Sequence, residues 1–206
     1  MQGCRRGEFS ARRCSGCVVG SVERICAETG IRLTDEERRQ LIAGLLARQH
    51  LILSGPPGGR KCELARALAF LLVDERRDRV CTLVGHPWWA GNTDDVAYYA
   101  NMQMAYSEWR LVYFLAAVLA DEQRTPGVRS VDSVGGYVVC IERMSPAEIG
   151  LYFGTLPYKL AAARQGTRRD IPVRFIGTYD SDTPPALDAW TLRVAASVHV
   201  NAASDR

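Results

Sequence analysis

The sequence predicts an α/β fold in which a parallel five-stranded sheet is flanked by helices. Short apolar runs alternate with longer segments of helical composition, which is typical of parallel strands joined by crossover helices. The run "YVVCIE" is almost continuously apolar, as in a strand covered on both faces. A glycine-rich loop, "GPPGGRK", separates the first strand from a helix.

Length, charge and the distribution of apolar residues limit the possible domain organisation, partners and location. A chain of 206 residues, of which 47% are hydrophobic, favours one sizeable core, predicted over residues 31–206 behind a basic, poorly ordered leader over residues 1–30. The net charge of +3 gives no support to a nucleic-acid partner. The sequence contains no apolar run of about 18 residues and no secretory signal, so we expect a cytoplasmic location without membrane contact.

The first predicted elements lead into the glycine loop. Residues 33–49 read as a helix with leucines and an isoleucine on one face, and Thr34 with Glu37 has the spacing of a capping box. "HLILS" has the length and composition of a strand, and residues 62–73 favour a helix through their alanine and leucine content. The order is therefore helix, strand, glycine loop and helix.

The later elements continue the alternation. They are a strand at 79–85, a helix at 107–124, a strand at 137–142, two helical pieces within 145–166 broken at Pro157, and strands at 173–182 and 195–201.

The glycine loop is a candidate phosphate site. A loop at the carboxyl end of a parallel strand directs its N–H groups, with the next helix N-terminus, at a bound anion. In the usual pattern, GxxxxGK[ST], the lysine reaches the outer phosphates and the hydroxyl holds Mg²⁺. A turn alone would explain the glycines and prolines, but not the spacing from Gly55 to Lys61 between a strand and a helix. The candidate cofactor-binding residues are Gly55, Pro56, Pro57, Gly58, Gly59, Arg60, Lys61, Cys62 and Glu63.

Two positions depart from this pattern. Arg60 carries a Cβ where glycine normally lets the backbone approach a ligand closely. Cys62 replaces the hydroxyl with a thiol, a soft ligand, whereas Mg²⁺ prefers hard oxygens.

The loop resembles that of the AAA+ ATPases, which commonly reads GPPGxGK[ST], and the resemblance covers about residues 34–199. "YVVCIERMSPAEIG" falls where that family has an apolar strand ending in Asp-Glu, and "VRFIGTYDSD" where it has a strand ending "IGTMN". The resemblance implies a P-loop NTPase fold, whose helical lid we expect to be absent or truncated here.

The resemblance also assigns the candidate catalytic and metal positions. Glu142 stands at the metal-holding aspartate, Arg143 at the catalytic glutamate, and Asp180 at the polar sensor. The candidate metal ligands are therefore Glu142 and Cys62, which occupies the hydroxyl position of the loop. An alternative register places Ile141 and Glu142 at the first two of these positions. Glu142 and Asp180 are the catalytic candidates in this account.

The C-terminal segment "FIGTYDSDTPPALDAWTLRVAASVHVNAASD" is similar to the ATPase-like domain of neuron navigators and cortactin-binding proteins. Restriction ATPase subunits also share the "IGTMN" strand, and "ALDAWTLR" partly fits their "LDxAL". The resemblance to the navigator type implies a cytoskeleton-associated scaffold.

The departures predict little or no ATP hydrolysis. Hydrolysis needs Mg²⁺ and a group that positions or activates water, and the permanently protonated Arg143 cannot act as a base. We expect a degenerate module that takes ATP, holds Mg²⁺ weakly, and works through protein partners, self-association included. The alternatives are an active AAA+ ATPase working as an oligomer and a P-loop small-molecule kinase.

Overall fold

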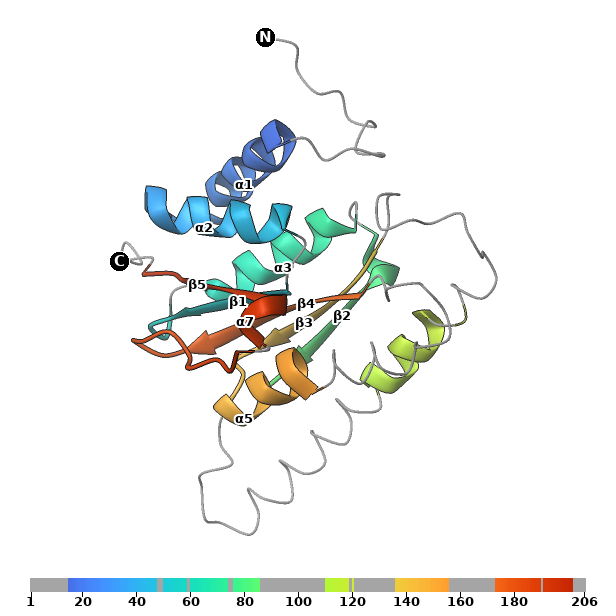
Figure 1. Ribbon diagram of the computed structural model, residues 1–206. Helices are drawn as coiled ribbons and strands as arrows, with labels where there is room; N and C mark the ends of the chain where they lie inside the picture. The colour runs from blue at the N-terminus through green and yellow to red at the C-terminus, as the bar shows by residue number, and fades with distance from the viewer. Residues whose placement is uncertain are drawn as a thin grey trace.

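The computed structural model describes residues 15–47, 50–58, 60–73, 76–85, 110–118, 120, 136–155, 173–189 and 191–201. Its five strands pair in parallel in the order β2-β3-β4-β1-β5 (Figure 1). They are β1 (His50–Gly55), β2 (Val80–Val84), β3 (Tyr137–Glu142), β4 (Val173–Asp180) and β5 (Ala195–His199). The parallel five-stranded sheet expected from the sequence is confirmed.

Helices cover both faces of this sheet (Figure 1). On one face lie α1 (Ser15–Thr29), α2 (Asp35–Leu46) and α3 (Lys61–Leu72). On the other lie a helix over 110–118, α5 (Pro146–Ile149) and the π-helix η2 (Gly150–Thr155), while the 3₁₀ helix η1 (Arg77–Arg79) and α7 (Thr191–Val194) precede β2 and β5. This is an α/β architecture, with the glycine loop between β1 and α3.

Alternating side chains of the strands divide the core into two clusters. Leu51 and Leu53 of β1 pack with α1, α2 and α3, whereas Ile52 packs with the helices of the opposite face. Every residue of β3 is buried. The continuous apolar run "YVVCIE" is thus explained by a strand between two helical layers.

The leader predicted over residues 1–30 is wrong for its second half. Residues Ser15–Thr29 form α1, and Val18, Val22 and Ile25 lie buried in the cluster that includes α3. The basic residues of the N-terminal stretch suggested disorder, but these three apolar side chains fall on one helical face and close the core above α3. Residues 1–14 lie outside the described part.

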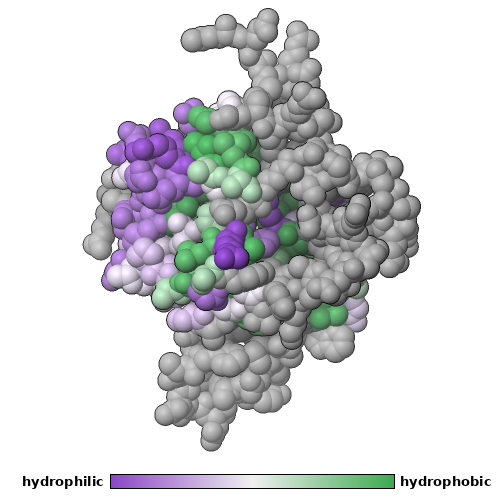
Figure 2. Space-filling model, viewed as in Figure 1, coloured by the Kyte–Doolittle hydropathy of each residue, from purple (hydrophilic) through white to green (hydrophobic). Residues whose placement is uncertain are grey.

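The predicted capping box at the start of α2 is present and has a second function. The Thr34 hydroxyl accepts a bond from the Glu37 amide at 3.2 Å, and the Thr34 amide donates to Glu37 Oε2 at 2.7 Å. The other oxygen, Oε1, accepts the amide of Asn201 at 2.7 Å. Glu37 therefore ties the segment after β5 to α2, whose charged first half forms a hydrophilic surface (Figure 2).

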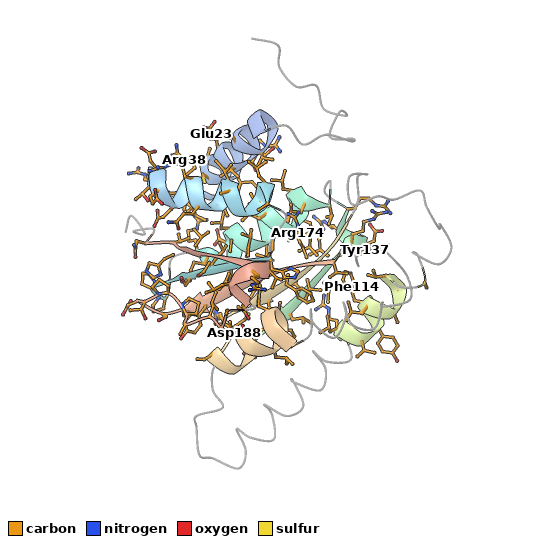
Figure 3. The ribbon with its side chains drawn as sticks, in the orientation of Figure 1. Glu23, Arg38, Phe114, Tyr137, Arg174 and Asp188 are labelled. Atoms are coloured by element: carbon orange, nitrogen blue, oxygen red, sulfur yellow. The ribbon has the colours of Figure 1, made fainter. Side chains whose placement is uncertain are left out.

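Two predicted helices are described only in part. Of the one predicted at 107–124, residues 110–118 are helical, and Phe114 packs edge-on against Tyr137 of β3 with ring centroids 5.9 Å apart (Figure 3). Of the pieces predicted within 145–166, α5 and η2 are seen, and the break at Pro157 lies outside the described residues. No helix in the described ranges is long and apolar enough to cross a membrane.

His50, at the start of β1, is held neutral in an aromatic environment. Its Nδ1 accepts the Phe175 amide at 3.1 Å, and its ring packs edge-on against Phe153 and Phe175. Burial, with a smaller contribution from the charge of Arg174, lowers the pKa of His50 to about 4.

This environment makes stability fall in acid. Because the folded pKa lies below the unfolded value of 6.5, the contribution is fully present above pH 6.5 and is lost as pH falls toward 4, by about 3 kcal/mol in total. Urea unfolding from pH 7 to 4 should show this slope. His50→Asn, whose side-chain oxygen can accept the Phe175 amide without titrating, should flatten it, and an identical slope in the two proteins would contradict this assignment.

Candidate phosphate-binding site

The glycine loop begins where three strands end together. Gly55, the last residue of β1, lies opposite Asp180 of β4, and Ser54 lies opposite His199 of β5. The Gly55 carbonyl accepts the Ser181 amide at 2.9 Å, so the chain after β4 is attached to the start of the loop. The loop thus lies at the carboxyl edge of the sheet, where open α/β folds bind ligands.

The loop enters α3 through a residue with left-handed backbone conformation. Arg60 precedes the helix at φ 50° and gives it no side-chain cap. Its guanidinium pairs instead with Glu63, 2.6 Å away. The first amides of α3 have no intrahelical acceptors, and a helix N-terminus favours an anion. Arg60 therefore adopts, at the position usually held by glycine, a left-handed conformation that glycine would adopt without strain. Gly59 lies outside the described residues.

Lys61 and Asp180, both predicted site residues, are brought together. Lys61 Nζ lies 2.9 Å from Asp180 Oδ1 and donates to the Pro56 carbonyl oxygen at 2.5 Å. The lysine side chain is 2% exposed, whereas that of Asp180 is 37% exposed. The buried cation is thus satisfied by a carboxylate on its solvent side.

Glu142, the candidate metal ligand and catalytic residue, is bound by an arginine. Arg66 of α3 holds both carboxylate oxygens, with its Nη2 2.6 Å from Oε2 and its Nε bonded to Oε1. Hydrogen bonding to this carboxylate raises the pKa of Arg66. The Glu142 side chain is only 7% exposed, so the pair closes the end of β3.

Cys62 contacts the sheet through Thr178 of β4. The thiol lies 3.4 Å from Thr178 Oγ1, and the same oxygen accepts the Arg143 amide at 2.8 Å. Arg143, at the position implied for the catalytic glutamate, is exposed and left-handed, with φ 56°. It brings a cation and no carboxylate to this edge of the sheet.

These residues do not fit Mg²⁺. The ion prefers several hard oxygen ligands, whereas Cys62 offers a thiol and the Glu142 carboxylate is already paired with Arg66. Within the described ranges, no three His, Cys, Asp or Glu side chains gather closely enough to hold a metal ion.

Arg66 and Thr178 were missed by the sequence reasoning, although each has a signal. Arg66 follows Cys62 by four residues and therefore shares its helical face toward the site. Thr178 precedes Asp180 by two residues and shares its face of β4. Periodicity places both near the loop, but their partners are fixed only by the packing of α3 on the sheet.

Comparisons with known proteins give weak structural likenesses. The first two are structures of Drosophila ORC with Cdc6, bound to AT-rich DNA (11% identity, TM-score 0.41) and to GC-rich DNA (13%, 0.39). The third is Drosophila ORC bound to DNA (12%, 0.36). Each match covers at least 98% of this chain but at most 36% of the other, so the chain spans about a third of those proteins. No protein-family model and no curated protein matches the sequence.

Proposed function

We propose that the chain is a degenerate AAA+-like module that binds ATP at the loop after β1 and hydrolyses it weakly or not at all. The observation that carries the proposal is the double hydrogen bond from Arg66 to Glu142. Glu142 is the carboxylate assigned to metal binding in one register of the resemblance and to water activation in the other. The pairing therefore places a fixed cation on this carboxylate in both cases.

Lys61 is the residue that most directly supports nucleotide binding. A buried lysine that already holds a carboxylate oxygen at 2.9 Å is in a position to hold a phosphate oxygen instead. Asp180 is partly exposed, so it can move into solvent when a ligand replaces it. The N-terminus of α3 adds amide donors on the same side of the loop.

Within the described residues, Glu142 is not free to act as a base and the side chains at the site do not fit Mg²⁺. Glu142 accepts two bonds from Arg66, and the following residue is Arg143. Without a carboxylate to position water or a site that fits a divalent cation, charge developing on the transferred phosphoryl group has little stabilisation. Bound ATP should therefore persist.

A module that retains its nucleotide acts most simply through protein contacts. The resemblance to neuron navigators and cortactin-binding proteins supports a place in a cytoplasmic, cytoskeleton-associated scaffold, with protein partners and self-association as the means of action. Pull-down of cytoskeletal polymer with the purified chain, with and without ATP, tests this part; no co-sedimentation in either condition would contradict it.

Lys61→Ala tests the binding site directly. Because charge-assisted hydrogen bonds contribute roughly 1.5 to 3 kcal/mol, the loss should weaken ATP binding by about tenfold or more in calorimetric titration. Arg39→Ala, which removes an exposed cation on α2, is the matched control and should bind as the unaltered chain does. Equal ATP binding by the Lys61→Ala protein, or no saturable heat with the unaltered chain, would contradict the proposal.

A further inference from the structure

The guanidinium of Arg66 binds the carboxylate of Glu142, which the sequence resemblance placed at the metal-holding position. We infer that the site binds nucleoside polyphosphates without a metal ion, with Arg66 supplying the positive charge. The inference rests on the proposed function and adds the form of the ligand, a metal-free polyphosphate. It starts from the mismatch between Mg²⁺ and the residues at the ends of β3 and β4.

Arg66 is bonded to one of the two predicted metal ligands and follows the other by one helical turn. It stands one helical turn after Cys62 on α3 and reaches across to bind both oxygens of Glu142. A cation is therefore built into the site from the chain itself, on the side of α3 that faces the strand ends.

A metal ion would have to displace this cation. Mg²⁺ could use Glu142 only by breaking two hydrogen bonds to a carboxylate that is 7% exposed, and it would gain a soft thiol from Cys62. It would also be placed beside the positive charge of Arg66, which repels it. Each of these effects disfavours Mg²⁺ binding, so Arg66 stays paired with Glu142.

Arg66 keeps donors for a ligand while it holds Glu142. A guanidinium has five N–H groups, and the pair with Glu142 uses Nε and Nη2. The arginine side chain is 51% exposed, so its outer edge is open to solvent. The planar donor fork matches phosphate oxygens, and arginine gives up its water more readily than an ammonium does. Arg66 can therefore bind a phosphate without leaving the carboxylate.

The first experiment compares ATP binding by the full chain in EDTA and in excess Mg²⁺, measured by calorimetric titration. Metal-free ATP is expected to bind with an affinity within about threefold of that in Mg²⁺. Binding more than tenfold tighter in Mg²⁺ would overturn the inference and leave the proposed function standing. Absence of binding in both conditions would overturn the two together.

Variants of Arg66 test whether its guanidinium supplies the positive charge that binds metal-free ATP. Loss of its phosphate contact in Arg66→Ala should weaken binding of metal-free ATP by about tenfold. Arg66→Lys, which keeps a cation beside Glu142 but loses the fork, should retain part of the affinity. Arg39→Ala is the control for a lost surface charge, and thermal melts check that each variant is folded. Unchanged metal-free binding by folded Arg66→Ala or Arg66→Lys would overturn the role of Arg66.

Discussion

Replacing Gly55 by alanine should lower the free energy of unfolding by about 3 kcal/mol or more, because backbone strain and steric overlap add. Gly55 has φ 150°, a conformation that L residues rarely adopt. A Cβ there would lie 2.1 Å from the Val200 carbonyl oxygen. Because that carbonyl belongs to the backbone, the overlap could be relieved only by moving the segment after β5. A hydrogen bond from the Val200 amide to the Ser54 carbonyl, at 2.8 Å, holds this segment in place.

Urea unfolding followed by circular dichroism measures this effect. Gly20→Ala is the matched control, because Gly20 lies within α1 and an added Cβ would meet no atom within 4 Å. Alanine should stabilise that helix by up to about 1 kcal/mol. If the free energy of unfolding of the Gly55→Ala protein lies within about 1 kcal/mol of that of the unaltered chain, the close contact between Gly55 and Val200 is contradicted.

The second large effect is a gain of affinity. Asp180→Asn should bind ATP about tenfold more tightly, because ATP would no longer have to displace a charged carboxylate from the buried Lys61. The amide can still accept a hydrogen bond from Lys61, so the fold should be kept. The anion that competes with the ligand is removed and the cation remains.

The same titration with Asp182→Asn controls for net charge. Asp182 is an exposed residue close to Asp180 in the chain, and its neutralisation changes the long-range field to the same extent. Only the Asp180 variant should show the tenfold gain. A matching gain in both variants would mean that general charge, and not the ion pair with Lys61, controls affinity.

Much of the architecture could be predicted because its signals are local. The apolar runs gave the strands, the spacing of Thr34 and Glu37 gave the start of α2, and the continuous run of β3 indicated a buried central strand. The spacing of Gly55 and Lys61 located the loop. Each of these features depends on residues close together in the chain, so pattern alone carries it.

The charge pairs of the site could not be predicted, because each joins distant parts of the chain. Lys61 meets Asp180 because β1 and β4 are adjacent in the sheet, and Arg66 meets Glu142 because α3 packs against β3. From the sequence, Glu142 and Asp180 are expected to serve metal binding and catalysis. Packing instead supplies each of them with a cation. The helix α1 was missed for a related reason. Its buried apolar side chains pack in the cluster that includes α3, and this contact also joins distant parts of the chain.

The central proposal is that ATP is bound at this loop and stays intact. Incubation of the full chain with γ-labelled ATP, rapid isolation of the complex and chromatography of the quenched nucleotide measures both parts together. The account predicts ATP bound intact, with the bound label lost in Lys61→Ala. Recovery of ADP with released phosphate, absent from Lys61→Ala, would contradict it by showing a working ATPase.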